Sequence, residues 1–173
     1  MKRNKNLAVL FPGKGYVVTC PLLYYAYLKY ERRGYECVSI SYGDYNNIDD
    51  ARNNVLIQIN KLDFSSYDDI VFLSKSMGTI VAGWIDDEIC ENVRHIYLTP
   101  IKDTLKYLKR EKNISIVIAG TNDPFLDANI LSAHCNQENI KMELIDDADH
   151  SLETTADVSA NIDILKRVVE LYY

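Results

Sequence analysis

Residues 69–83 of the chain read DIVFLSKSMGTIVAG. The apolar run 69–73 is typical of a buried β-strand, and apolar residues at helical spacing follow Met77. Only a short polar segment separates the two, which leaves room for a sharp turn. We therefore expect a strand, a tight turn with a serine at its apex, and a helix over residues 77–89.

The same alternation continues outward from this stretch in both directions. Short runs rich in β-branched or aromatic residues predict five further strands, at residues 7–11, 35–42, 93–98, 114–119 and 140–145. Longer amphipathic stretches predict helices, at residues 19–33, 47–62, 125–138 and 155–172, with a shorter one near 101–110. Strands that alternate with helices imply a mostly parallel sheet covered on both faces. We expect a single α/β domain over residues 1–173, built as a three-layer sandwich with six strands.

Ser76 is the candidate nucleophile. In an open parallel sheet, ligands bind outside the carboxyl ends of the strands, where this serine lies. Small residues two positions before and after it, Ser74 and Gly78, would keep the strand and the helix from colliding. Ser74 fits this pattern less well, because Ser76 rather than a glycine stands two positions after it. The start of the following helix directs N–H groups toward an oxyanion formed beside Ser76.

A serine hydroxyl needs a base, and the chain contains three histidines. His95 lies inside a predicted strand and is interpreted as a structural histidine with its hydrogen bonds satisfied. His134 lies in the middle of a predicted helix and is interpreted as a surface residue. His150 follows a strand, at the same edge of the sheet as Ser76, and is therefore the candidate base.

The acid that orients this base is expected in another loop at the same edge. Asp123, in the turn-forming sequence GTNDP, is the candidate, and Pro124 is expected to open the next helix. An Asx turn or a helix cap is the structural alternative for Asp123. Asp127, one turn into that helix, is the substitute. At the first helix, Thr19 is expected to be the cap before Pro21.

These residues resemble those of a known family, the α/β-hydrolases, in the chain order Ser, Asp, His. The phrases SKSMG, GTNDP and DHSL are similar to the elbow, acid and histidine motifs of its small members. Within the family, these motifs are most similar to those of dienelactone-hydrolase-like and minimal lipase- or esterase-like proteins. The resemblance covers nearly the whole chain from Leu7 onward.

The resemblance implies a function and further site residues. It implies a serine hydrolase that cleaves a small carboxylic ester or thioester through an acyl-enzyme on Ser76. It also implies an oxyanion hole formed by the N–H group of Met77 with that of Lys14 or Gly15. The sheet would match strands three to eight of the family, with the first two absent.

The chain departs from the family pattern at three places. Ser74 replaces the first glycine of the elbow, and Pro12 stands where the family often has histidine. Residues 99–113, between the fourth and fifth strands, are too few for a cap domain. We therefore expect an open site without a lid.

Composition excludes several other classes of protein. The net charge is −6 and there is no basic run, so nucleic-acid binding is not expected. No apolar stretch approaches the roughly 20 residues of a membrane span, and the apolar run after the basic start is too short for a signal peptide. The four cysteines are scattered and are expected as free thiols in a reducing cytoplasm. No residue cluster predicts a metal or a cofactor.

Two other functions compete with the hydrolase. Gly13-Lys14-Gly15 after the first strand is a G-x-G, which would suit a nucleotide-binding, Rossmann-like protein, but Val18 replaces the third glycine. A non-catalytic binding protein on a hydrolase fold is the second alternative.

Tyrosines and lysines near the site have further interpretations. Tyr16, Tyr42 and Tyr45 fall at the site edge and would line an acyl or aromatic pocket. Lys14 and Lys75 near the nucleophile would favour an anionic substrate, but the interpretation taken is that they are ordinary exposed lysines. Four tyrosines on the first predicted helix are read as packing of the core and its rim, with a homodimer surface as the alternative: Tyr24, Tyr25, Tyr27 and Tyr30.

Overall fold

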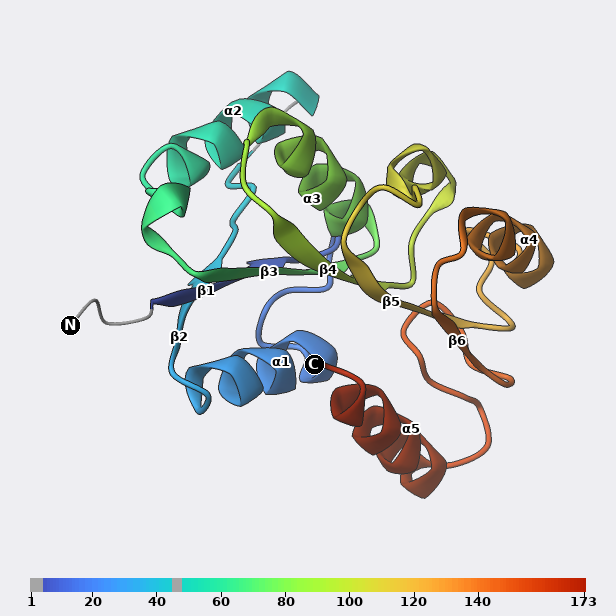
Figure 1. Ribbon diagram of the computed structural model, residues 1–173. Helices are drawn as coiled ribbons and strands as arrows, with labels where there is room; N and C mark the ends of the chain where they lie inside the picture. Colours follow the sequence, from blue (N-terminus) through green and yellow to red (C-terminus); the bar gives the residue numbers. More distant parts are fainter. Residues whose placement is uncertain (1–4, 45–47) are drawn as a thin grey trace.

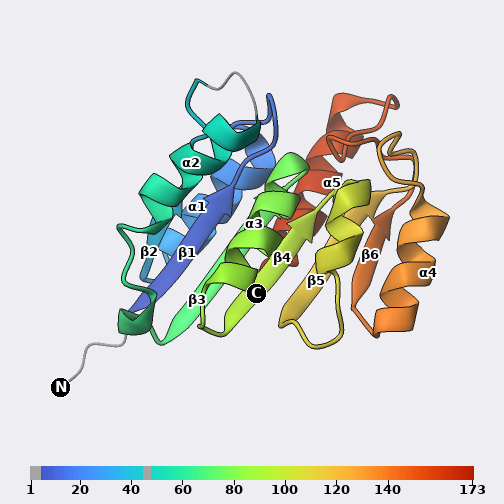
Figure 2. The same cartoon turned by 90° about the horizontal axis from the view of Figure 1, so that it is seen from above.

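A computed structural model of the chain describes residues 5–44 and 48–173. Its centre is a six-stranded sheet in the order β2-β1-β3-β4-β5-β6, with every neighbouring pair parallel (Figure 2). The strands are β1 Asn6–Phe11, β2 Tyr35–Ser39, β3 Asp69–Lys75, β4 Val93–Leu98, β5 Ile114–Gly120 and β6 Met142–Ile145. The central strand β3 therefore has its carboxyl end beside those of β1 and β4.

Helices cover both faces of the sheet (Figure 1). On one face lie α1 (Pro21–Glu31) and α5 (Val158–Glu170). On the other face lie α2 (Ile48–Ile59), α3 (Met77–Glu88), α4 (Ala128–Glu138) and the 3-10 helix η2 (Lys102–Tyr107), while a shorter 3-10 helix, η1 (Phe64–Ser66), precedes β3. The expectation of a three-layer α/β sandwich with a six-stranded parallel sheet is confirmed.

Each central strand is apolar on both sides because both sides are covered. In β1, Ala8 and Leu10 belong to the core beneath α1 and α5, whereas Leu7, Val9 and Phe11 belong to the core beneath α2 and α3. This pattern explains why the strands read as continuous apolar runs in the sequence rather than as alternating ones.

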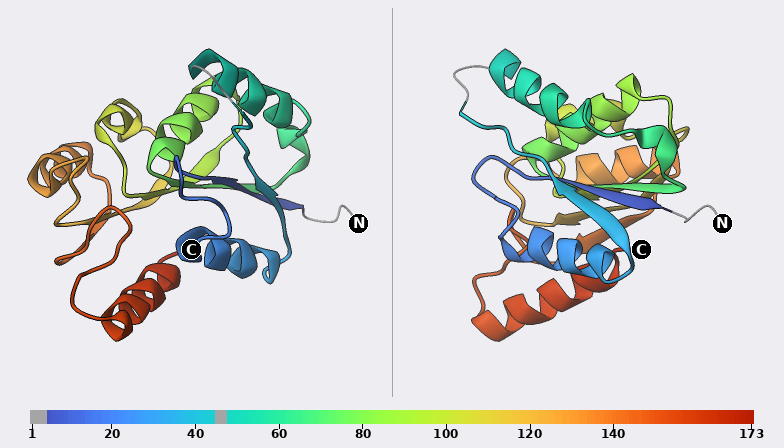
Figure 3. Two further views of the ribbon diagram at one scale, coloured as in Figure 1. Left: turned by 180° about the vertical axis from the view of Figure 1, so that it is seen from behind. Right: turned by 90° about the vertical axis from the view of Figure 1, so that its left-hand side faces the viewer.

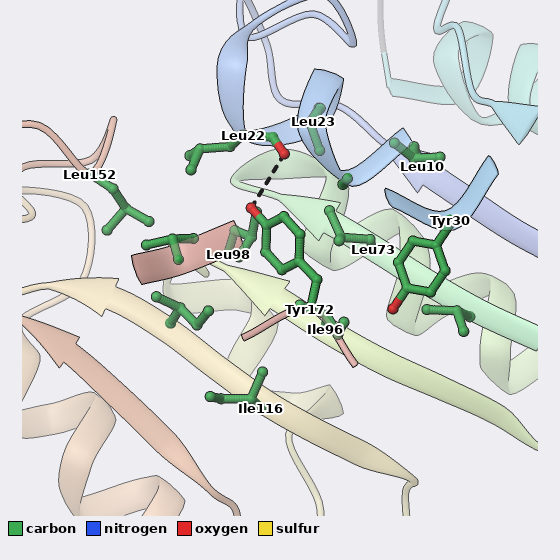
Figure 4. Close-up of a cluster of buried hydrophobic side chains, with 14 of the residues drawn as sticks. Leu10, Leu22, Leu23, Tyr30, Leu73, Ile96, Leu98, Ile116, Leu152 and Tyr172 are labelled. Atoms are coloured by element: carbon green, nitrogen blue, oxygen red, sulfur yellow. Dashed lines mark hydrogen bonds between the residues drawn. The ribbon is translucent and has the colours of Figure 1, made fainter. Parts of the chain in front are cut away.

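The carboxyl-terminal helix closes the first of these cores. Tyr172 is fully buried, and its hydroxyl donates to the carbonyl oxygen of Leu22 at 3.3 Å (Figure 4). The hydroxyl of Tyr30 donates to the carbonyl oxygen of Tyr173 at 3.1 Å. Figure 3 shows α1 and α5 side by side on this face in both views, so these bonds join two segments from opposite ends of the chain. Of the tyrosines on α1, Tyr30 is in the core whereas Tyr24 and Tyr25 are exposed.

Several predicted helix ends were wrong. The residue at the start of α1 is Cys20, without a side-chain cap, rather than Thr19. Pro124 does not open α4, which begins at Ala128 because the carboxylate of Asp127 accepts hydrogen bonds from the next N–H groups. The segment near 101–110 forms a 3-10 helix. In the described part of the chain, no helix is long and apolar enough to cross a membrane.

Candidate active site

Ser76 occupies the sharp turn between β3 and α3. Its backbone has φ 55° and ψ −122°, an unusual conformation for a residue with a side chain. Such conformations cost about 1–3 kcal/mol and persist only where the surrounding structure imposes them. Here the N–H of Ser76 donates to the carbonyl oxygen of Leu98 in the neighbouring strand at 3.0 Å, which fixes the turn from one side.

Small residues surround this turn because backbone segments meet there. A Cβ atom on Gly78 would lie 2.2 Å from the carbonyl oxygen of Phe11. A Cβ atom on Gly13 would lie 3.0 Å from the Cβ of Ser76. Ser74 is buried, and its hydroxyl donates weakly to the carbonyl oxygen of Ile96 at 3.4 Å. A side chain larger than that of glycine therefore does not fit at position 78, and Ser74 is held in the sheet away from the turn.

Three side chains from three different loops form a hydrogen-bonded chain. The Nε2 atom of His150 lies 2.7 Å from the Oγ of Ser76, and the Nδ1 atom lies 2.7 Å from Oδ2 of Asp123. The side chain of Asp123 is only 1% exposed, and its other oxygen accepts the N–H of Phe125 at 2.9 Å. This arrangement holds the imidazole in one orientation, with one ring nitrogen facing a hydroxyl and the other facing a carboxylate.

The loops that carry Asp123 and His150 are packed against each other. A Cβ atom on Gly120 would lie 2.1 Å from the carbonyl oxygen of Ala148, so this position leaves no room for a side chain. The N–H of Asn122 donates to the same carbonyl at 2.9 Å. Because β5 and β6 are neighbouring parallel strands, their ends bring the two loops together.

Lys75, the residue before Ser76, is buried rather than exposed, and that interpretation of the sequence was wrong. Its Nζ donates to Oγ1 of Thr99 and to the carbonyl oxygen of His150, each at 2.5 Å, and lies 4.9 Å from the ring centroid of Tyr16. The ammonium group therefore ties the end of β3 to the loop that carries His150. The predicted strand ended at residue 73, whereas β3 continues through Lys75. A strand of that length would have predicted that Lys75 is buried in the sheet.

Burial has a clear electrostatic effect on this lysine. Desolvation disfavours the ammonium and lowers the pKa of Lys75 to about 8. The negative charges of Asp123 and Asp149 oppose this shift. The Lys75 side chain therefore changes charge within a few units of neutral pH.

The loop after β1 approaches Ser76 through Gly13. The N–H of Gly13 donates to the carbonyl oxygen of Tyr16 at 3.1 Å, and the hydroxyl of Tyr42 donates to the carbonyl oxygen of Pro12 at 2.7 Å. These two bonds fix the loop from opposite sides. Lys14 and Gly15 are exposed at its tip, and Gly15 has φ 80°.

Met77 lies in the first turn of α3, whose leading N–H groups have no partner within the helix. The loop after β1 packs against this start of α3, since a Cβ atom on Gly78 would lie 2.5 Å from the carbonyl oxygen of Pro12. Tyr45, expected at the site edge, lies outside the described residues.

Other candidate residues lie away from Ser76 or serve another purpose. Asp127 caps α4 instead of facing the imidazole. His134 makes a contact of 2.8 Å with the carbonyl oxygen of Leu108. His95 is fully buried in β4, but among the described residues neither of its ring nitrogens has a hydrogen-bond partner, so the expectation of satisfied hydrogen bonds was wrong. Phe125, which the sequence did not single out, is 61% exposed, and its ring centroid lies 4.4 Å from that of His150.

Among the residues with described positions, no three His, Cys, Asp or Glu side chains converge in a way that would hold a metal ion.

Known structures resemble this fold over nearly its full length. An α/β serine hydrolase homologue from Coxiella burnetii superimposes with a TM-score of 0.72 at 13% identity, covering 97% of this chain and 85% of that one. A lidless α/β serine hydrolase from Xanthomonas campestris gives 0.67 at 12% identity, covering 98% and 82%. Est1E from Butyrivibrio proteoclasticus gives 0.65 at 15% identity, covering 97% and 88%.

No protein-family model and no curated protein sequence matches the chain. The structural likeness therefore establishes the fold, which is that of a compact α/β-hydrolase without a cap domain. The prediction of this fold from the sequence motifs is confirmed.

Proposed function

We propose that the protein is a serine hydrolase that cleaves a small carboxylic ester or thioester through an acyl-enzyme on Ser76. The observation that carries this proposal is the continuous hydrogen-bonded chain from Asp123 through His150 to Ser76 at the carboxyl edge of the sheet. A nucleophile, a base and an acid that orients the base are the three parts that such chemistry needs.

In the first half of the reaction, Oγ of Ser76 attacks the substrate carbonyl carbon while Nε2 of His150 takes the hydroxyl proton. Asp123 keeps the other ring proton on Nδ1 and stabilises the charged imidazolium. The tetrahedral intermediate then expels the alcohol or thiol, which leaves with the proton from Nε2. The acyl group remains on Ser76.

In the second half, water replaces the alcohol or thiol. His150 takes a proton from the water as its oxygen attacks the acyl carbon, and returns that proton to Oγ of Ser76 when the carboxylic acid leaves. The oxyanion of each intermediate would accept hydrogen bonds from the N–H of Met77 and from that of Lys14 or Gly15. The position of Met77 in the first turn of α3, where N–H groups point out of the end of the helix, supports the first of these donors.

The backbone of Ser76 also favours an enzyme over a binding protein on the same fold. A strained φ of 55° at a serine that faces an oriented imidazole supports a catalytic role for Ser76.

A fluorophosphonate probe tests the proposal directly, because it reacts preferentially with a serine hydroxyl that is activated as a nucleophile. We expect stoichiometric labelling of the wild type at Ser76, located by mass spectrometry of peptides. Labelling should be lost in Ser76→Ala and in His150→Ala. It should persist in Ser74→Ala, the matched control two residues away.

Two results would overturn the assignment. One is well-folded wild-type protein that takes up no label at any concentration of the probe. The other is labelling that persists in the Ser76→Ala variant.

A further inference from the structure

A groove of about 260 Å³ lies between α2, α3 and η2, on the sheet face opposite α1. Its walls are largely apolar: Ala51 and Val55 come from α2, Val81 from α3 and Tyr107 from η2. Its volume is slightly below the ~300–1,000 Å³ of pockets that bury drug-sized ligands, so it suits a short aliphatic chain or an aromatic ring.

One end of the groove adjoins the nucleophile. Met77, which lines it, is the residue directly after Ser76. Tyr42, which also lines it, donates its hydroxyl to the carbonyl oxygen of Pro12, in the loop that packs against Ser76. From Met77 the groove follows one face of α3 to Trp84, a run of about 10 Å at the helical rise of 1.5 Å per residue.

The far end of the groove carries donors of hydrogen bonds. Trp84 lines the groove, and its Nε1 is buried without an acceptor among the described residues. The guanidinium carbon of Arg52 lies 4.2 Å from the centroid of the Trp84 ring. The Nζ of Lys106 lies 4.9 Å from the centroid of the Tyr107 ring.

These two cations are available to a ligand. Both side chains line the groove and are exposed at its rim. Among the side chains that the structure describes, which leave out those of residues 45–49, no carboxylate lies within ion-pair distance of either Arg52 or Lys106. Stacking on an aromatic ring restrains each cation while leaving its N–H groups free to donate.

We propose that this groove binds the apolar arm of the substrate and that this arm ends in a carboxylate held by Arg52 and Lys106. The inference rests on the proposed hydrolysis at Ser76. The substrate class that it names is a half-ester or half-thioester of a dicarboxylic acid, or an ester of an acid of similar shape. The apolar walls favour the arm, and the two cations favour its charged end.

A matched pair of substrates tests the charge at the end of the arm. The 4-nitrophenyl esters of suberic acid and of octanoic acid differ only in a terminal carboxylate against a methyl group. We expect kcat/KM to be about five- to twentyfold higher for the suberate half-ester, since each exposed ion pair contributes up to ~1 kcal/mol. This preference should shrink as ionic strength rises.

Variants assign the preference to the groove. The double variant Arg52→Gln, Lys106→Gln should bring the ratio of the two kcat/KM values to about one, because it removes both charges. Lys102→Gln, which removes an exposed charge from the same 3-10 helix outside the groove, should leave the ratio unchanged.

Binding can be measured without turnover because Trp84 is the only tryptophan in the chain. In Ser76→Ala, titration with monomethyl suberate should change the tryptophan fluorescence with saturation, and methyl octanoate should do so more weakly. The change should weaken when the double substitution is added to Ser76→Ala.

The two readouts separate the two proposals. Hydrolysis of both esters without a preference, and without a fluorescence response, would overturn the groove assignment while leaving the hydrolase intact. A preference for the octanoate ester would overturn the carboxylate end. Saturable binding of monomethyl suberate to a protein that hydrolyses neither ester would support the groove and overturn the hydrolase.

Discussion

The described part of the chain holds two histidine–aspartate pairs, which lie in different environments. His150 and Asp123 meet at 2.7 Å in loops at the carboxyl edge of the sheet. His95 and Asp86 lie 3.4 Å apart between β4 and α3, and the ring of His95 is completely buried against the parallel ring of Tyr97. Each pair also has a lysine nearby, Lys75 for the first and Lys112 for the second.

The same pair of residue types has different expected roles because the two histidines differ in solvent exposure and in their neighbours. The imidazole of His150 is 19% exposed and faces the hydroxyl of Ser76, so on the proposed mechanism a proton can pass to and from a substrate. The imidazole of His95 is sealed from solvent and faces no hydroxyl at hydrogen-bond distance. The inner pair is therefore expected to act on stability, and the outer pair on activity.

The largest expected effect separates the two histidines. His150→Ala should lower kcat for a 4-nitrophenyl ester by about 10⁴-fold or more, because it removes the proposed base. His95→Leu should leave kcat within a few-fold of the wild type. Steady-state kinetics on both variants, with circular dichroism to check folding, makes the comparison. Equal losses in the two variants would contradict the division of roles.

The two aspartates should differ almost as strongly. Asp123→Asn should lower kcat by about 10²- to 10⁴-fold, since the amide favours the wrong imidazole tautomer. Asp86→Asn should keep kcat but lower the free energy of unfolding by about 1–3 kcal/mol, through weaker bonds to Lys112. Kinetics and urea unfolding measure the two effects. An Asp86→Asn variant with low kcat and unchanged stability would refute this assignment.

The two lysines should give opposite dependences of stability on pH. Burial lowers the pKa of Lys75 to about 8, so between about pH 8 and 10.5 the unfolded chain binds more protons at this residue. The free energy of unfolding of the wild type should therefore rise by up to about 3 kcal/mol relative to that of Lys75→Met as pH rises through that range.

For Lys112, burial lowers the pKa, but bonds to Asp86 and Asp87 raise it further than burial lowers it. The stability that Lys112 contributes should therefore be lost as pH rises above its ordinary pKa. The free energy of unfolding of the wild type should then fall relative to that of Lys112→Met. Urea unfolding of both variants from pH 7 to 11 tests the pair, and slopes of the same sign would contradict the assignment of charge.

The smallest effect concerns acid. Burial raises the pKa of Asp86, but contacts with His95 and Lys112 hold it below the ordinary value of 3.8. The folded state therefore resists protonation of this carboxyl more than the unfolded state does, and stability should fall as pH drops below about 4. The Asp86→Asn variant should not show the part of this fall in stability that comes from protonation of Asp86. Thermal melting of both proteins from pH 6 to 3 is the measurement, and parallel curves would count against it.

The fold could be predicted because its signals are local. Apolar runs such as 69–73 identify buried strands, and their alternation with helices restricts the topology to a parallel sheet. The same rule placed Ser76, Asp123 and His150 in loops at one edge, and the structure brings their side chains together.

What could not be predicted depends on contacts between distant segments. Lys75 is buried because Thr99 and His150, 24 and 75 residues away, supply its acceptors. The groove beside Trp84 requires three helices whose relative placement no sequence window contains. Asp127 was expected inside a helix because a cap and a first-turn residue look alike in sequence.

The close contact between Gly120 and Ala148 has a mechanical consequence. Because no side chain fits between the two loops, neither can shift without pushing the other. Backbone contact and the bond from the N–H of Asn122 to the carbonyl oxygen of Ala148 are therefore expected to keep Asp123 and His150 at a fixed separation. An insertion in either loop would have to be matched by a change in the other, so the two loops are expected to diverge in concert among descendants of this chain.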